Sequence, residues 1–576
     1  MTTGSPARHP GAEPPPPAFR FSRMRRPGKG GKKPDDRTCR GEKYQMMSQP
    51  EEKSRENEKV ARAAGVVGLA TMLSRVFGFI RDMVVAGFFG AGLVTDAFFV
   101  AFRIPNLLRR LLAEGSLTVS FVPVFTEYLK KRSRQEALEL ADVAFTSLSV
   151  VLVVVSIAGV LFAPFIVAVM APGFVKHDVQ YELTVLLTRF MFPYIFFISL
   201  VALCMGILNS LRHFAAPALS PVVLNISMIL AALLLRDFFS EPVFSLAVGV
   251  MVGGVLQLAM QWPFLLKMGV RLRPNFRFRH PGLKRIGFLM MPAAFGAAIY
   301  QINVFIGTVL ASLLPKGSVS YLYYADRIVE LPLGVFAIAV GTAALPSLSD
   351  QVARGEFEDF KKTISFSLRL ILFITVPATV ALLALREPIL SVLFQRGAFD
   401  AAATVKTAEA LLYYTLGLWA FSVIRVIVSA FYSLQDTKMP MKAAIVALIV
   451  NVAASIMLMG PMRHGGLALA TSLASAVNVF VLGIVLKKRI GSYLNRDFYR
   501  SLCKVSAASL VMWLSILLVE TIIPWRIAGP LDQRLLFLTM SVMSGLTTYF
   551  AASWALKCPE MVMVIRTVKA KLRGKR

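Results

Sequence analysis

The chain has 576 residues, of which 56% are hydrophobic and 17% are charged, whereas soluble domains average about 25% charged residues. Apolar runs of membrane-spanning length recur from about residue 62 to residue 557. This composition excludes an ordinary soluble protein, and the short alternating segments of a β-barrel do not dominate. We therefore expect an all-α polytopic membrane protein.

Lys and Arg number 63 against 33 Asp and Glu, which gives a formal net charge of +30. In a soluble protein this excess would indicate nucleic-acid binding. Here the basic residues gather in the tails and in short connections between apolar runs, which is typical of cytoplasmic loops. The charge therefore predicts a lipid bilayer as partner and no nucleic acid.

Residues 1–57 are rich in Pro, Gly, Lys and Arg and show no apolar periodicity. This composition predicts a disordered basic tail in the cytoplasm. No short apolar segment with a cleavage site of small residues follows the basic residues, so we expect no signal peptide. Met46 or Met47 is an alternative start of the protein.

Fourteen apolar runs of about 20 or more residues predict fourteen transmembrane helices. They cover residues 62–90, 95–129, 140–171, 181–211, 217–236, 241–267, 284–314, 319–349, 362–395, 404–433, 440–460, 465–487, 499–523 and 533–557. Gly and Pro within the longer runs predict bends. These residues include Pro105, Gly115, Pro332, Gly341 and Pro377. Alternate connections are richer in Lys and Arg and lie on the side of both termini, so both termini are predicted to be cytoplasmic.

Three pairs of segments indicate that the chain repeats itself. FRIPNLL (102–108) parallels DRIVELP (326–332), SFVPVFTEY (120–128) parallels AALPSLSDQ (343–351), and LNSLRHFAAP (208–217) parallels FYSLQDTKMP (431–440). Matched residues in the three pairs lie 223 or 224 positions apart. Each repeat holds six helices, so both halves insert with the same orientation, as in transporters that bind substrate between two pseudo-symmetric lobes.

The repeat predicts the domain organisation. We expect a basic cytoplasmic tail (1–57), an N-lobe of six helices (58–270), a C-lobe of six helices (271–490), two additional helices (491–560) and a second basic cytoplasmic tail (561–576). The two additional helices lie outside the repeat and require an explanation of their own.

The first two apolar runs contain an unusual number of charged residues. These are Arg75, Arg81, Asp82, Asp96, Arg103, Arg109, Arg110 and Glu114. An Arg or Asp at the centre of a membrane-spanning helix costs about 2.5–3.5 kcal/mol on insertion scales. We therefore expect these side chains to face water, one another or a ligand along a polar pathway.

Internal ion pairs are the simpler interpretation of this charge. The candidate pairs are Arg75 or Arg81 with Asp82, Arg110 with Glu114, and Arg327 with Glu330, which lies three residues from Arg327 and four from Asp326. The repeat nevertheless places several arginines on facing helices of the two lobes. They are Arg75, Arg81, Arg109 and Arg327. Because arginine stays ionised and binds phosphate oxygens bidentately, the pattern predicts a cationic cavity for an anionic substrate.

An enzymatic interpretation finds little support in the sequence. The adjacent aspartates Asp35 and Asp36 lie in the predicted tail. No nucleophile with a neighbouring base, no glycine-rich phosphate loop and no cluster of metal-ligating residues is visible. We expect a transporter without a cofactor or metal.

Four long segments stand out as specific motifs: SRVFGFIRD (74–82), TDAFFVAFRIPNLLRRLLAEG (95–115), GSVSYLYYADRIVELPLG (317–334) and FYSLQDTKMP (431–440). They closely resemble the MurJ (MviN) family of lipid II flippases, which belongs to the multidrug/oligosaccharidyl-lipid/polysaccharide (MOP) exporter superfamily. The resemblance covers about residues 60–557, and only the N-terminal tail departs clearly from it. It implies peptidoglycan biosynthesis: lipid II, the undecaprenyl-pyrophosphate-linked precursor, would move from the inner to the outer leaflet of the bacterial inner membrane by alternating access.

The resemblance also implies roles for particular residues. Arg81, Arg109 and Arg327 would bind the pyrophosphate. The cavity would be lined by Arg75, Asp82, Asp96, Asn106, Arg110, Glu114, Ser320, Asp326 and Glu330. The two additional helices and the second lobe would form a hydrophobic groove for the polyprenyl tail.

Some relatives carry a sodium site in the second lobe, for which Asn451 and Thr471 are weak candidates here. No aspartate is present in the helices predicted at 284–314 and 440–460, so sodium coupling is not expected. Transport would be driven by the membrane potential or by an ion gradient. We expect a monomer whose partners are lipid II, the bilayer and the peptidoglycan-synthesis machinery.

Three alternatives stay open at this point. Another polyprenyl-linked saccharide, such as an O-antigen unit, would use the same kind of cationic site. A cation-coupled drug antiporter would show twelve helices and an acidic cavity. A polyprenyl-phosphate enzyme would turn over its product without transport.

Overall fold

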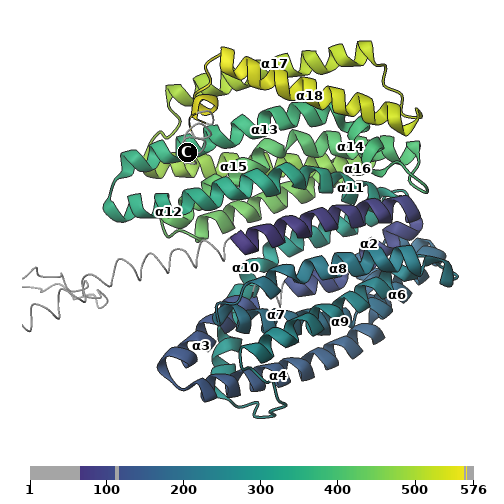
Figure 1. The fold of residues 1–576 in the computed structure, drawn as a ribbon, viewed down its shortest axis with the longest axis vertical. Coiled ribbons are helices and arrows are strands. Elements are labelled where there is room, and N and C mark those ends of the chain that lie inside the picture. Colours follow the sequence, from purple (N-terminus) through teal and green to yellow (C-terminus); the bar gives the residue numbers. More distant parts are fainter. Residues whose placement is uncertain (1–64, 111–115, 564–565, 567–576) are drawn as a thin grey trace, which may run out of the picture. The chain divides into compact units, whose positions relative to one another are not determined.

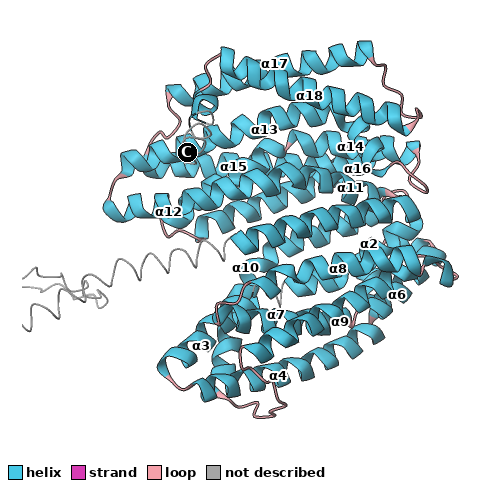
Figure 2. Ribbon diagram, in the orientation of Figure 1, coloured by secondary structure: helices cyan, strands magenta, loops and turns pink. Residues whose placement is uncertain are grey.

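The structure, a computed structural model, describes residues 65–110, 116–563 and Arg566. All regular secondary structure in these residues is helical, which confirms the all-α expectation (Figure 2). The predicted tail at 1–57, most of the tail at 561–576, and the residues Glu114 and Gly115 lie outside the described residues.

The first half of the described chain begins with a helix at residues 65–89. It continues through α2 (Leu93–Leu108), α3 (Thr118–Lys131), α4 (Arg134–Leu161), α5 (Ala163–Met170), the 3-10 turn η2 (Phe174–Lys176), α6 (Asp178–Met191), α7 (Tyr194–Ser210), α8 (Ala215–Leu234), the 3-10 turn η3 (Arg236–Phe238) and α9 (Phe244–Lys267). Helix α9 packs against both α7 and α8, and α3 and α4 pack against α7 (Figure 1).

The second half begins at α10 and ends with a pair of helices that pack on each other and on α13 (Figure 1). Its elements are α10 (Pro281–Ser312), α11 (Ser318–Pro332), the π-helix η4 (Leu333–Ala337), α12 (Ile338–Arg354), α13 (Phe357–Phe394), α14 (Ala401–Leu416), α15 (Leu418–Ser433), α16 (Lys438–Ile490), α17 (Arg496–Ile522) and α18 (Leu531–Ala555). The terminal pair, α17 and α18, corresponds to the two helices predicted outside the repeat.

Within the described residues, nine helices are long and apolar enough to cross a membrane. The longest, α16, covers the two runs predicted at 440–460 and 465–487. A sharp break at Arg463, with φ 49° and ψ −130°, divides it between those runs. The membrane-protein class is therefore confirmed, whereas the number of fourteen crossings stays a prediction.

The same irregular turn ends α7 and α15, at the offset found in the sequence repeat. Arg212 and Gln435 lie 223 positions apart and adopt left-handed conformations with φ 61° and 57°. In each turn the next N–H donates to the carbonyl oxygen five residues back, at 2.9 and 3.0 Å. This 6→1 hydrogen bond satisfies one of the last carbonyl groups of each helix.

Three helix breaks also recur at this offset. Phe162 and Leu385 interrupt α4–α5 and α13, Pro193 and Gly417 separate α6–α7 and α14–α15, and π-helical backbone begins at Arg109 and Leu333. The first pair lies 223 positions apart and the others 224. The repeat is thus visible in the backbone as well as in the sequence.

Only some of the predicted bends have irregular backbone. Pro332 ends α11 and leads into η4, as expected. Gly341 and Pro377 instead lie in continuous helix. The break in α13 falls at Leu385, three residues before Pro388, whose ring clashes with the preceding turn and removes a hydrogen-bond donor.

One hydrophobic core contains residues from both halves of the chain. Phe98 and Phe99 of α2 lie in it with Tyr324 of α11 and Phe394 of α13. Phe99 stacks on Tyr323 with ring centroids 3.9 Å apart. The helices that contribute these rings meet near the connections that are poorer in Lys and Arg, so both halves are joined at that end.

Gly90 lies where the end of the helix at 65–89 comes close to the backbone of Ala398. It adopts φ +66°, and a Cβ at Gly90 would lie 2.4 Å from the carbonyl oxygen of Ala398. Next to it, the Ala398 N–H donates to the carbonyl oxygen of Gly87 at 2.9 Å. Glycine is therefore required at this position both for the left-handed conformation and because there is no room for a Cβ.

Replacement of Gly90 by alanine should lower the apparent melting temperature of the purified protein. The left-handed conformation costs a non-glycine residue about 1–2 kcal/mol, and the clash with Ala398 adds to this cost. Gly355→Ala is the matched control, since Gly355 has φ +75° with open space around its Cβ position. Equal shifts for the two variants in a thermal unfolding assay would contradict the importance of the Ala398 contact.

Candidate functional site

The carboxylate of Asp82 lies at the centre of a charged cluster that joins the two halves of the chain. Asp82 is in the helix at 65–89 and is 2% exposed. The Nη2 of Arg81 donates to its Oδ1 at 2.7 Å, and the Nε of Arg327 on α11 pairs with its Oδ2 at 3.0 Å. One carboxylate therefore neutralises part of the charge of two guanidinium groups.

The hydroxyl of Tyr323 completes this cluster. It donates to Asp82 Oδ1 at 3.1 Å and accepts from Arg81 Nη2 and Arg327 Nη2, each at 3.0 Å. A tyrosine hydroxyl has one donor and two acceptor positions, so all of them are occupied. Arg327 also lies over the Tyr323 ring, 5.0 Å from its centroid.

A third contact extends the cluster into α8. Arg81 Nη1 donates to the Oδ1 of Asn225 at 3.0 Å, and the Asn225 Nδ2 donates to the carbonyl oxygen of Ser74 at 3.2 Å. Arg81 is only 7% exposed, and a buried guanidinium needs acceptors of this kind. The sequence-based pair of Arg81 with Asp82 is therefore present, within a larger network.

The cluster becomes exposed on the side of α11. The Arg327 side chain is 34% exposed and donates from Nη1 to Glu330 Oε2 at 2.8 Å, while the Glu330 side chain is 49% exposed. Asp326 and Arg110 are exposed as well. The charged surface thus runs from buried Asp82 outward to accessible Arg327, where an anion could reach a guanidinium.

Three further residues predicted for the site lie on another part of the helix at 65–89, on α2 and directly after α2. Arg75 packs against Gly334 of η4. The contact is close enough that a Cβ added to Gly334 would lie 1.8 Å from the Nη1 of Arg75. Arg109 is half-buried in the π-helical backbone that follows α2. Asn106 donates to the carbonyl oxygen of Phe102 in its own helix at 2.9 Å. The structure therefore brings Arg81 and Arg327 together, with Arg75 placed against a different element.

Asp96 joins α2 to the beginning of α11. Its Oδ2 accepts from the Gly317 N–H at 2.6 Å, and its Oδ1 accepts from the Ser320 N–H at 2.8 Å and the Ser320 hydroxyl at 2.5 Å. An acidic side chain is favoured at a helix N-terminus, where unpaired N–H groups point outward. Asp96 and Ser320 are 1% and 0% exposed, so they line no open surface in this structure.

The weak sodium candidates make ordinary helix contacts. Asn451 Nδ2 donates to the Oδ1 of Asn303 on α10 at 2.7 Å, and the Thr471 hydroxyl donates to the carbonyl oxygen of Leu467 at 3.0 Å. Among the described residues, no group of three or more His, Cys, Asp or Glu side chains is arranged to hold a metal ion.

Two members of the cluster were not singled out as site residues from the sequence. Tyr323 precedes Arg327 by one helical turn, and this spacing could have indicated it. Asn225 bonds a neighbouring helix, as polar residues within membrane helices commonly do, but nothing in the sequence identified Arg81 as its partner.

A family model described as lipid II flippase MurJ matches residues 85–528. The chain belongs to the MurJ family. A probable lipid II flippase MurJ of Vibrio cholerae serotype O1 is 37% identical over 503 residues, which cover 86% of this chain and 96% of that relative. The lipid II flippase MurJ of Burkholderia cenocepacia is 38% identical over 432 residues, which cover 74% of this chain and 84% of the relative.

Solved structures agree with this assignment. A lipid II flippase MurJ in an inward closed conformation matches with a TM-score of 0.72 and 27% identity, over 85% of this chain and 99% of that chain. An inward-facing MATE family multidrug transporter of the MOP superfamily matches with a TM-score of 0.60 and 15% identity, over 75% and 98% of the two chains. The second likeness concerns the fold alone. The MurJ family is one of transporters, which confirms the transporter interpretation over an enzymatic one.

Replacement of Asp82 by asparagine should strongly destabilise the protein, because removal of one partner from a buried ion pair costs about 3–5 kcal/mol. The same change at Asp326, which is exposed on the neighbouring α11, should cost about 1 kcal/mol or less. Apparent melting temperatures of the two variants in detergent would measure the difference. Similar melting temperatures would show that Asp82 does not hold the cluster together.

Proposed function

We propose that this protein moves lipid II from the cytoplasmic to the outer leaflet of the bacterial inner membrane. The observation that carries this proposal is the arginine cluster around Asp82, which joins the two halves of a chain from the MurJ family. The diphosphate of a polyprenyl-linked precursor is anionic, and guanidinium groups bind such oxygens through parallel N–H donors. A cationic site in apolar surroundings matches a charged headgroup with a lipid tail.

Arg327 is the arginine that would meet the diphosphate first. Glu330 occupies its exposed side, and Asp82 holds its buried side. An arriving diphosphate could replace Glu330 while Asp82 stays in place, so that Arg327 always has an anionic partner. Arg81 and Arg109 would then complete the binding of the diphosphate as the halves rearrange.

The cavity of the proposed pathway would be walled by the half-buried and exposed residues around this cluster. They are Arg75, Asn106, Arg110, Asp326 and Glu330, with Glu114 beyond the described residues. Asp82 would organise the arginines from its buried position. Asp96 and Ser320 would join the wall only when the contact between α2 and α11 opens.

Alternating access would follow from contacts that join the halves at one end. Besides Asp96 with α11, the Gly173 N–H donates to the Ser312 hydroxyl at 3.2 Å, and Ala398 bonds Gly87. These residues lie near connections poor in Lys and Arg, which face away from the cytoplasm. We infer that this structure represents a state closed to the outside, and that rocking of the halves exposes the site to the other leaflet.

The proposed topology is fourteen crossings in two lobes of the same orientation, 58–270 and 271–490, with both termini cytoplasmic. The recurring backbone breaks at offsets of 223 and 224 support the two-lobe arrangement. In the segment 491–560, α17 and α18 pack on α13 and expose large apolar side chains. Leu514, Leu518 and Met543, for example, are 55%, 61% and 58% exposed. Such a surface would accommodate the polyprenyl tail.

The proposed driving force is the membrane potential, without a cofactor. Each unit charge moved through the full field is worth about 2.3 kcal/mol per 100 mV. A potential that is negative inside favours outward movement of an anion and inward return of an empty cationic site. An ion gradient is the alternative, for which Asn451 and Thr471 are the candidate ligands.

The proposed working unit is a monomer in the inner membrane, with lipid II as substrate and the peptidoglycan-synthesis machinery as partner. A flippase for another polyprenyl-linked saccharide is the second candidate, because the cluster would contact the diphosphate that such cargoes share. Transport measured with each cargo would distinguish the two.

Replacement of Arg81 or Arg327 by alanine should abolish complementation of cells depleted of their own lipid II flippase. Loss of a charge-assisted hydrogen bond costs about 1.5–3 kcal/mol, which corresponds to about 10- to 100-fold in binding. Externally accessible lipid II would be quantified at matched membrane levels of each variant. Arg354→Ala is the control, since it removes only an exposed pair with Asp350. Normal lipid II exposure in both cluster variants would refute the proposed binding of the diphosphate by Arg81 and Arg327.

Replacement of Glu330 by glutamine should tighten binding of undecaprenyl diphosphate by up to about fivefold. The Glu330 carboxylate competes with the diphosphate for Arg327, and an exposed ion pair of this kind is worth about 0.2–1 kcal/mol. Native mass spectrometry of the purified protein would measure this affinity. Glu127→Gln is the matched control, as Glu127 makes an exposed pair with Arg285 at 2.9 Å. Unchanged or weaker binding by the Glu330 variant would contradict the proposed exchange of partners.

A further inference from the structure

The segment between α9 and α10, residues 268–280, combines exposed arginines with exposed aromatic rings. We refer to it as the linking segment. Its sequence, MGVRLRPNFRFRH, contains four arginines and no acidic residue. Arg271 and Arg279 are exposed and form no ion pair with a carboxylate in the described part of the chain. The proposed substrate site does not use this segment.

Hydrogen bonds to α4 fix the linking segment in place. The Arg273 N–H donates to Asp142 Oδ1 at 2.9 Å, and the Asn275 N–H donates to the Thr146 hydroxyl at 2.8 Å. Arg277 Nη1 pairs with Glu139 Oε1 at 2.7 Å. The segment therefore presents its side chains from a defined backbone, although it has no regular secondary structure.

The contacts on α4 place the linking segment at the edge of an apolar surface. Asp142, Thr146, Val150 and Val154 are spaced four residues apart on α4, so each side chain is turned by about 40° from the one before it. The first two hold the segment, whereas Val150 and Val154 are 42% and 62% exposed. With a rise of about 1.5 Å per residue, Val150 lies only about 6 Å beyond Thr146 along the helix. The segment thus runs along the boundary between polar and lipid-facing surface.

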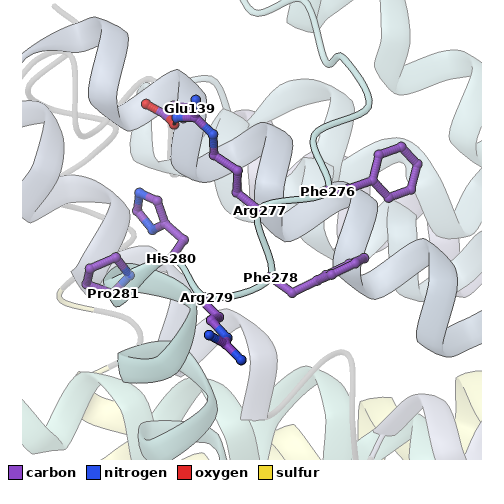
Figure 3. Close-up of a pocket in the computed structure, with 7 residues that line it drawn as sticks. All are labelled: Glu139, Phe276, Arg277, Phe278, Arg279, His280 and Pro281. Carbon is purple, nitrogen blue, oxygen red and sulfur yellow. Dashed lines mark hydrogen bonds and ion pairs between the residues drawn. The ribbon is translucent and has the colours of Figure 1, made fainter.

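Two phenylalanines project from this boundary. Phe276 and Phe278 are 65% and 50% exposed, with ring centroids 6.0 Å apart. Figure 3 shows both rings on one side of the segment, while Arg277 between them turns toward Glu139. A pocket of about 610 Å³ lies among Glu139 and residues 276–281. The segment therefore presents two exposed aromatic rings beside exposed arginines.

We propose that the linking segment binds the headgroups of anionic phospholipids in the cytoplasmic leaflet, with Phe276 and Phe278 inserted at the boundary of headgroups and acyl chains. The basic connections lie on the cytoplasmic side, where anionic lipids attract clustered Lys and Arg. Apolar side chains beside basic ones are the usual composition of segments that lie in the membrane interface.

A phospholipid fits this surface better than the diphosphate of a transported substrate does. The segment is held against α4, whose exposed valines face outward, whereas the Asp82 cluster lies between the helix at 65–89 and α11. The inference therefore concerns a lipid partner of the protein and is independent of which cargo is transported.

The test is lipid binding by the purified full-length protein in detergent, measured by native mass spectrometry with dioctanoyl phosphatidylglycerol. Combined Arg271→Gln and Arg279→Gln substitutions should weaken binding by about 25-fold, because each basic residue near an anionic surface contributes about fivefold. Lys487→Gln with Lys488→Gln is the matched control, since it removes the same charge from exposed residues at the end of α16. This control should retain the affinity of the parent protein.

A second variant tests the aromatic contribution. Phe276→Ser with Phe278→Ser keeps all the charges and should weaken binding of phosphatidylglycerol severalfold, while both residues are exposed enough for the fold to tolerate the change. Equal loss in the lysine control, or equal binding of dioctanoyl phosphatidylcholine, would overturn the proposal, because either result indicates non-specific association. Displacement of phosphatidylglycerol from this surface by farnesyl diphosphate at lower concentration would also overturn it, since the surface would then prefer a diphosphate.

Discussion

The shared carboxylate of Asp82 is the interaction on which the candidate site depends. Arg81 and Arg327 come from helices of different halves of the chain, and Asp82 contacts both within 3.0 Å. Without it, two positive charges would face each other beside an aromatic core, and an unpaired buried charge costs several kcal/mol. With it, the halves meet through a polar contact that leaves Arg327 partly accessible. The contact therefore combines stability with an available cationic group.

Local patterns in the sequence predicted the parts of the site that lie on one helix. Arg81 with Asp82, and Arg327 with Glu330, follow from adjacency and helical spacing. The remaining partners of Arg81 are Asn225 and Tyr323, which are 144 and 242 positions away in the sequence. Periodicity indicates which residues share a helix face, but it does not indicate which faces of distant helices meet. For that reason the complete network required the structure.

The repeat predicted the backbone better than single prolines did. Four irregular positions recur at offsets of 223 or 224, among them the left-handed residues Arg212 and Gln435. Pro377, by contrast, lies in continuous helix, although the same residue type at Pro388 follows a break. A proline is tolerated within a membrane helix where neighbouring groups satisfy the carbonyl groups that it frees. Whether a proline breaks its helix therefore depends on the neighbouring helices. The repeat preserves the arrangement of those helices, whereas the residue type alone does not specify it.

The saturated hydroxyl of Tyr323 has a consequence for how the site responds to a ligand. Its single proton is committed to Asp82, and both lone pairs are committed to arginines. No member can leave without orphaning another group in a medium of low dielectric constant, where hydrogen bonds reinforce one another. The hydrogen bonds of the cluster are therefore coupled, because a change in the position of Arg327 alters the contacts of Tyr323 and, through it, those of Arg81. A ligand that binds Arg327 would in this way affect the contact of Arg81 with Asn225 on α8.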